Sequence, residues 1–355
     1  MPKPRTAVFP IVFLCLILLA SAAGADDTQM IGDKDTAKQY WKTATLAPKG
    51  IGYSRLFEEI LLPVIQEETK GDLALKVYWG GVMGDDEQVI KKMRVGQLQG
   101  AGLSGQGTFL LSPEIPVLGL PFLFNSYEEV DFIKEKMIDT FDGIVAKEGF
   151  KVLLWLDQDF DQIYSAKVPV QSAADFPKAR FITWFGPLEG RILELLGANP
   201  VPMGVTEIPS SMRAGVADAM MAPAIWVAGT QLYSVFRYVN PIRIRYVPGF
   251  VVVTTEAWNG APEKHRKRLY ELRLPLAKKF CTRSRQESDR FLAAIISYGL
   301  KEVKSTPEQT AKIKELTTPV WNELAGKLYS KALLDEILGY LKEYRASHPQ
   351  ACPAK

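Results

Sequence analysis

Apolar residues recur along this chain in two patterns, one typical of helices and one typical of strands. Residues 53–69 carry apolar side chains at the spacing of one helical face, namely Leu56, Ile60, Leu61, Val64 and Ile65. Residues 40–45 and 73–79 are short, rich in aromatic or β-branched residues and followed by proline or glycine, so we predict strands there. Residues 85–94 are a predicted helix that Asp85 caps and Gly96 ends.

The rest of the chain continues this alternation of strands and helices. It predicts a short strand over 99–103 with a glycine-rich turn at 104–107, an amphipathic helix over 126–149, a buried strand over 151–157, a strand pair over 239–255 around Pro248 and Gly249, helical sequence after Pro262 with a kink at Pro275, and a final helix pair over 307–346. Strands that alternate with helices are typical of α/β folds.

Residues 177–223 show the alternation most clearly. A strand-like segment with Arg180 precedes a helical run, a short strand, a second helical run and a turn with Met221 and Pro223. This order places loops at the carboxyl ends of parallel strands, where open α/β sheets bind small ligands. We therefore expect Arg180 to anchor an anionic small molecule, with Trp184 and Met221 beside it. A salt bridge from Arg180 to an acid on the same sheet is the alternative.

Three segments are predicted to cross between two parts of the molecule: residues 151–157, residues 239–255 and the long helix after Pro262. They indicate a two-lobed α/β fold with hinge strands and a domain-spanning helix, which closes on a ligand by hinge motion. The expected division is lobe I over 38–155 and 244–282, lobe II over 156–243 and 283–346, and a tail over 347–355.

Residues 1–25 are typical of a cleavable signal peptide. Lys3 and Arg5 precede an apolar run and small residues suited to cleavage. The run is shorter than the roughly 20 residues of a membrane span and contains Pro10, which favours export over anchoring. No later stretch is long and apolar enough to span a bilayer. We therefore expect a periplasmic mature chain that does not insert into the membrane.

The composition of the 355 residues is that of a globular protein long enough for two domains, with 47% hydrophobic and 23% charged residues. A formal net charge of +3, without a basic stripe, argues against nucleic-acid binding. After the leader only Cys281 and Cys352 remain. A disulfide between them and two free thiols are both open readings.

No motif of an enzyme or of a metal site is visible. His265 and His348 are the only histidines, and no cysteine or carboxylate cluster has metal-ligand spacing. A serine–histidine–aspartate set, a phosphate loop and a dinucleotide glycine motif are also missing. The chain is therefore predicted to bind rather than catalyse, without a cofactor or metal. A secreted α/β enzyme stays an alternative, because Asp161 lies close to Tyr164 in the sequence.

Several segments together resemble the DctP-type periplasmic solute receptors of TRAP transporters. They are residues 41–50, 77–85, 117–124, 178–181 and 196–202, and their order and spacing carry the resemblance over essentially the whole mature chain. The resemblance implies a two-lobed binder that captures a small organic acid and delivers it to a sodium-driven membrane permease. It also places Arg180 at the family's carboxylate-binding arginine, a role that suits the planar, always charged guanidinium.

Two departures from the family pattern change the expected ligand. Asp161 stands where a second basic residue is usual, and residues 218–223 lack the usual asparagine. The side chains expected near the ligand, besides Arg180, are Trp184, Phe185, Met221 and Trp226. They predict a monocarboxylate with an apolar or aromatic body.

Some roles stay open in the sequence. Asp161 either meets an ammonium group of the ligand or only balances the charge of Arg180. Gln106 either donates to the ligand from the opposite lobe or belongs to a solvated turn. Trp226 either faces the cleft or packs in the core. A carrier or sensor of a hydrophobic ligand, without a permease, is a further functional alternative.

Overall fold

A computed structural model describes residues 27–349, so the predicted signal peptide and Cys352 lie outside the described residues. The strands are β1 (Thr28–Ile31), β2 (Gln39–Thr45), β3 (Leu73–Tyr78), β4 (Gly100–Gly102), β5 (Phe150–Ser165), β6 (Ile182–Thr183), β7 (Val201–Pro202), β8 (Ala219–Ala222), β9 (Tyr238–Thr254) and β10 (Lys301–Glu302). The predicted strands at 40–45 and 73–79 are therefore confirmed.

The helices alternate with these strands. They are α1 (Tyr53–Leu56), α2 (Leu62–Thr69), α3 (Asp86–Arg94), α4 (Gly105–Leu110), α5 (Tyr127–Ala146), α6 (Pro187–Leu195), α7 (Ile208–Arg213), α8 (Ala224–Gly229), α9 (Thr255–Gly260), α10 (Glu263–Glu271), α11 (Arg273–Tyr298), α12 (Pro307–Thr317), α13 (Val320–Leu324) and α14 (Lys331–Ser347). A π-helical turn, η1 (Phe57–Leu61), joins α1 to α2, and the 3-10 turn η4 (Val205–Glu207) precedes α7.

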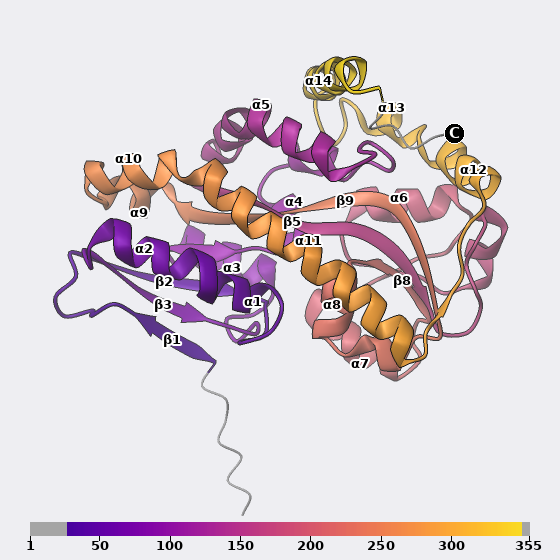
Figure 1. Cartoon of the computed structure of the whole chain (residues 1–355), viewed down its shortest axis with the longest axis horizontal. Helices are drawn as coiled ribbons and strands as arrows, with labels where there is room; N and C mark the ends of the chain where they lie inside the picture. Colours follow the sequence, from indigo (N-terminus) through magenta and orange to yellow (C-terminus); the bar gives the residue numbers. More distant parts are fainter. Residues whose placement is uncertain (1–26, 350–355) are drawn as a thin grey trace, which may run out of the picture.

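One mixed sheet runs through the molecule in the order β1-β3-β2-β4-β9-β5-β8, and β10 pairs with β9. In lobe I, β2 is parallel to both β3 and β4. In lobe II, β6 and β7 form a separate parallel pair. The long strands β5 and β9 are antiparallel along almost their whole length and join the two lobes (Figure 1). The limits that we expect for each lobe stay a prediction, because these strands belong to both.

Three local predictions were wrong. The predicted strand pair over 239–255 is one continuous strand, β9, and Pro248 sits in it opposite Asp157, beside a shift in register that accommodates the proline. Residues 219–222 form strand β8 rather than a turn, because they pair with β5. The predicted kink at Pro275 is instead a break at Leu272, between α10 and α11, and Pro275 lies in the first turn of α11, where a proline removes no intrahelical hydrogen bond.

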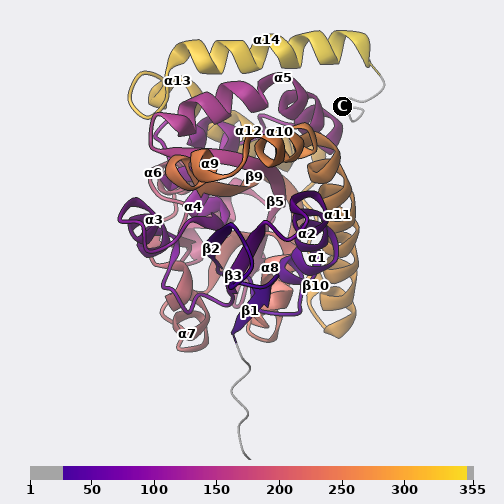
Figure 2. The ribbon, with the colours of Figure 1, turned by 90° about the vertical axis from the view of Figure 1, so that its left-hand side faces the viewer.

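The long helix α11 passes across both lobes in front of the sheet (Figure 1) and packs against β5, α1 and α8. Helix α5 also packs on β5 and is joined to α11 by the ion pairs Arg285–Asp131 and Arg273–Asp139, and α14 lies on α5 (Figure 2). Arg345 of α14 donates to both carboxylate oxygens of the buried Glu129 of α5 at 2.8 Å. Within residues 27–349, no helix is both long and apolar enough to cross a bilayer.

Candidate ligand-binding cleft

A cavity of about 280 Å³ lies where the two lobes and the long strands meet. Lobe I contributes loops that follow β2, β3 and β4, the joining strands contribute residues 156–158 and 249–251, and α11 contributes Phe280. Lobe II contributes residues that follow β7 and β8, which are Val205, Thr206, Pro209, Ile225, Trp226, Gly229 and Thr230. We call this cavity the cleft.

The position of the cleft follows from the topology of the sheet. Strands β2, β3 and β4 all end at it, since Thr45, Gly80 and Gly102 line it. Strands β7 and β8 of lobe II end at it from the other side. The cleft therefore lies at the carboxyl ends of parallel strands, as the sequence pattern predicts for a ligand site.

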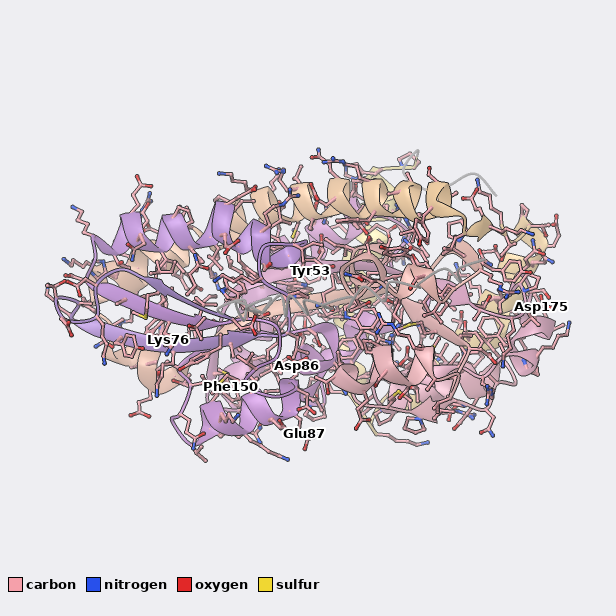
Figure 3. The ribbon with its side chains drawn as sticks, turned by 90° about the horizontal axis from the view of Figure 1, so that it is seen from below. Tyr53, Lys76, Asp86, Glu87, Phe150 and Asp175 are labelled. Carbon is pink, nitrogen blue, oxygen red and sulfur yellow. The ribbon has the colours of Figure 1, made fainter. Side chains whose placement is uncertain are left out.

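Few polar groups line the cleft, and hydrogen bonds within the protein hold most of them. The Tyr53 hydroxyl donates to the backbone carbonyl of Gln158 at 2.5 Å, and Gly105 N–H donates to Gln158 Oε1 at 2.7 Å. Ser104 donates through its hydroxyl to the buried Asp86. Figure 3 shows Tyr53 and Asp86 near the middle of the molecule, where the lobes meet. Burial raises the pKa of Asp86 to about 6, against the hydrogen bonds from Ser104.

Asp157 is the carboxylate among the lining residues, and positive charges behind the cleft neutralise it. Its Oδ1 pairs with Lys134 and accepts from the Tyr246 hydroxyl at 2.6 Å, and its Oδ2 accepts from Arg285 Nε at 2.7 Å. Burial by itself would raise the pKa of Asp157, but Lys134 and Arg285 outweigh it and lower the pKa to about 2. Asp157 therefore ties α5 and α11 to β5.

Arg180 does not line the cleft. The strand begins only at Ile182, so Arg180 lies at the amino end of β6, and the cleft is at the carboxyl ends. Its side chain is 53% exposed, its Nε is 3.4 Å from Asp218 Oδ2, and its Nη2 donates to the Gly215 carbonyl at 2.7 Å. The structure thus shows the internal salt bridge that the sequence left as the alternative.

Of the residues predicted near the ligand, Trp226 is the one that lines the cleft. Behind it stands Trp184, with ring centroids 4.8 Å apart, and behind Trp184 stands Phe185 at 4.1 Å. Trp184 is buried and donates its indole N–H to the Met221 carbonyl at 3.1 Å. These aromatic rings form a wall between the cleft and the interior of lobe II. Met221 is fully buried in β8, and Gln106 lies in α4 outside the lining.

Beyond the wall lies a fully buried charged cluster. Arg245 Nε is 2.6 Å from Asp161 Oδ2, its Nη2 is 3.0 Å from Glu189 Oε1, and its guanidinium carbon lies 4.1 Å from the centre of the Phe185 ring. Burial raises the pKa of Asp161, and the nearby Glu189 adds to this against the pull of Arg245. Asp161 therefore balances Arg245 rather than Arg180.

Glu189 is a buried anion at the start of α6. Its Oε2 accepts from the Thr183 hydroxyl at 3.0 Å and from the backbone N–H groups of Trp184 and Phe185 at 2.7 and 2.9 Å. A carboxylate at a helix N-terminus is favourable in itself. The chain thus supplies its own anion to the basic group and amides of lobe II.

Sequence reasoning missed most of the lining. Thr45 ends β2, and Ser104, Thr206 and Ile225 closely follow the ends of β4, β7 and β8, so strand ends alone were the signal that could have found them. Gln158 lies inside the long β5 and gave no such signal. Within the described residues, no group of three or more histidine, cysteine, aspartate or glutamate side chains is arranged to hold a metal ion.

Comparison with known proteins agrees with this architecture. Residues 47–327 match the family model described as bacterial extracellular solute-binding protein, family 7. The 2,3-diketo-L-gulonate-binding periplasmic protein of Escherichia coli is 23% identical over 276 residues, which is 77% of this chain and 78% of that protein. The C4-dicarboxylate-binding periplasmic protein of Rhodobacter capsulatus is 24% identical over 293 residues, 81% of this chain and 85% of that protein.

The solved structures of this kind share the fold. The sugar acid binding protein of Advenella mimigardefordensis in complex with galactonate superposes with a TM-score of 0.80 at 18% identity, over 86% of this chain and 98% of that one. The two-lobed α/β prediction and the resemblance seen in the sequence are both confirmed. The chain belongs to the bacterial extracellular solute-binding protein family 7, the DctP-type receptors of TRAP transporters.

Proposed function

We propose that this chain is the periplasmic receptor subunit of a TRAP-type transporter, which binds a small organic solute in the cleft and delivers it to a membrane permease. The observation that carries the proposal is the position of the cavity. It is enclosed by both lobes, the joining strands and α11, so that hinge motion about β5 and β9 would open and close it.

The lining supports an apolar body for the solute. Leu46, Ile51, Phe57, Ile225, Trp226 and Phe280 make up much of it. This agrees with the apolar or aromatic part of the ligand predicted from the sequence. The named relatives bind sugar acids or dicarboxylates.

A substitution at Gly229 tests whether the cleft is the binding site. Gly229 lines the cleft at the end of α8, and a Cβ there meets no atom within 4 Å. Gly229→Phe should therefore fill the cleft without disturbing the fold. The control is Gly143→Phe on the exposed side of α5, where a Cβ also meets no atom within 4 Å.

The assay is denaturation of each purified protein followed by mass spectrometry of the released small molecules. The wild type and Gly143→Phe should release the same compound, and Gly229→Phe should release none. Equal amounts of that compound from all three proteins would show that the solute binds elsewhere.

A carrier or sensor that never meets a permease would use the same cleft, and the apolar lining favours it as the second candidate. Uptake of the identified solute by bacteria with and without the encoding gene separates the two. Loss of uptake on deletion is expected for the transport receptor, and unchanged uptake would favour the carrier.

A further inference from the structure

We infer that the solute of this receptor is uncharged at neutral pH rather than an organic acid, an inference that rests on the proposed function of the cleft. The first reason is the lining itself. Among the described residues that line the cleft there is no lysine, arginine or histidine. A carboxylate moved from water into such a site loses its hydration without gaining a charged partner, which is strongly unfavourable.

Two basic residues close in sequence to the lining, Lys49 and Arg55, are engaged elsewhere. Lys49 donates to the Thr28 carbonyl at 3.2 Å, on the far side of its loop. Arg55 Nη2 is 2.6 Å from Glu287 Oε2 of α11. Neither side chain lines the cleft.

The basic residues behind the lining are neutralised. Lys134 pairs with Asp157, and Arg285 pairs with both Asp157 and Asp131, so these two cations face two carboxylates and offer the cleft no net positive charge. Arg245 lies behind Phe185 and serves two carboxylates, those of Asp161 and Glu189. The field that reaches the cleft from this side is therefore neutral or negative, which disfavours an anion.

A second, smaller chamber of about 60 Å³ extends the apolar surface. It shares Thr45, Phe57, Gly102 and Val251 with the cleft. Its other lining residues are almost all apolar, and they include Trp41. The indole Nε1 of Trp41 is buried without a hydrogen-bond partner. A solute that reaches past Phe57 thus meets an almost entirely apolar lining, which again suits an uncharged molecule.

Matched pairs of amide and carboxylate test the charge alone. The probes are indole-3-acetamide against indole-3-acetate and octanamide against octanoate, titrated by calorimetry into the purified protein at neutral pH. Each amide should bind at least about tenfold more tightly than its carboxylate, because only the carboxylate has to give up a charged hydration shell. The apparent affinity of each acid should fall about tenfold per pH unit above the acid's own pKa, since only its neutral form enters.

A positive charge introduced at the rim of the cleft should weaken the preference for amides over carboxylates. Thr206 is an exposed lining residue of lobe II. Thr206→Lys should raise the affinity for the carboxylates relative to the amides by about tenfold, as an opposite charge does at close range. The uncharged variant Thr206→Met, of similar length, should keep the preference of the wild type.

The outcomes separate this inference from the proposed function. The inference would be overturned if the carboxylates bound the wild type as tightly as the amides do, independently of pH. If they also failed to bind Gly229→Phe, the cleft would still be the solute site. Probes that bind equally to the wild type and to Gly229→Phe, or that bind to neither, would count against both.

Discussion

Replacing Arg245 by methionine should destabilise the protein strongly, because it removes the one cation that two buried carboxylates share. Arg245, Asp161 and Glu189 all have fully buried side chains. Glu189 would keep its hydrogen bonds from Thr183, Trp184 and Phe185, so the main loss falls on Asp161. Breaking a buried ion pair from one side typically costs about 3–5 kcal/mol.

The free energy of unfolding from guanidinium titration measures this loss. The control is Arg180→Met, which removes an ion pair whose arginine is 53% exposed and which should lose less than about 1 kcal/mol. The double variant Arg245→Met, Asp161→Leu should recover much of the loss, since Asp161 is no longer left unpaired and Glu189 keeps its three other hydrogen bonds.

The deficit of Arg245→Met should also depend on pH. Without Arg245 the folded state holds Asp161 protonated at pH values where the unfolded chain does not. Folded protein then binds more protons than unfolded protein, so stability falls as pH rises. The deficit should therefore be smaller near pH 5 than near pH 8. A loss below about 1 kcal/mol at both pH values would refute the account of the buried cluster.

Further variants test the two sides of α4. Asp86→Asn should remove a pH dependence. Because the pKa of Asp86 in the folded state is raised to about 6, the folded wild type binds more protons than the unfolded chain between about pH 4 and 6. Its free energy of unfolding should therefore fall by about 3 kcal/mol relative to that of the variant as pH rises through that window. The same pH dependence of the unfolding free energy in both proteins, measured by urea titration, would contradict this. Gly105→Ala places a Cβ 2.2 Å from Val247 and 2.5 Å from Phe185, so it should lower the free energy of unfolding by about 1–3 kcal/mol. Gly143→Ala, in open space on a helix, should not destabilise, and an equal effect at both glycines would refute the packing argument.

The sequence was informative about the elements and their kind. Asp85 caps α3 through a hydrogen bond from Gln88 N–H, as its residue type and position predict. The long amphipathic pattern after Ser126 became α5, with Ser126 as its cap. Such features depend on neighbours three or four residues apart, so the chain carries them locally.

The residues at which strands begin and end were harder to predict from the sequence, and this led to a wrong placement of Arg180. A strand predicted to contain Arg180 would bring that side chain near the ligand, but the ladder with β7 begins only at Ile182. Whether a residue opens or closes a strand depends on its pairing partner, which lies elsewhere in the chain. The pattern at Ser104 and Gly105 likewise predicts a turn, but in the structure Ser104 caps helix α4 by accepting a hydrogen bond from Gly107 N–H. The buried Asp86 in turn accepts a hydrogen bond from Ser104 N–H.

The sequence by itself therefore determined the α/β class, the two lobes and the family, and it predicted a cleft at the carboxyl ends of the strands. The tertiary structure alone decided which side chains face that site. Arg245 and Asp161 meet because β9 and β5 are paired across 84 residues of chain, and Glu189 joins them from a third element. A charge has no effect on a ligand until its distance and its partners are fixed, and only the packed fold fixes both.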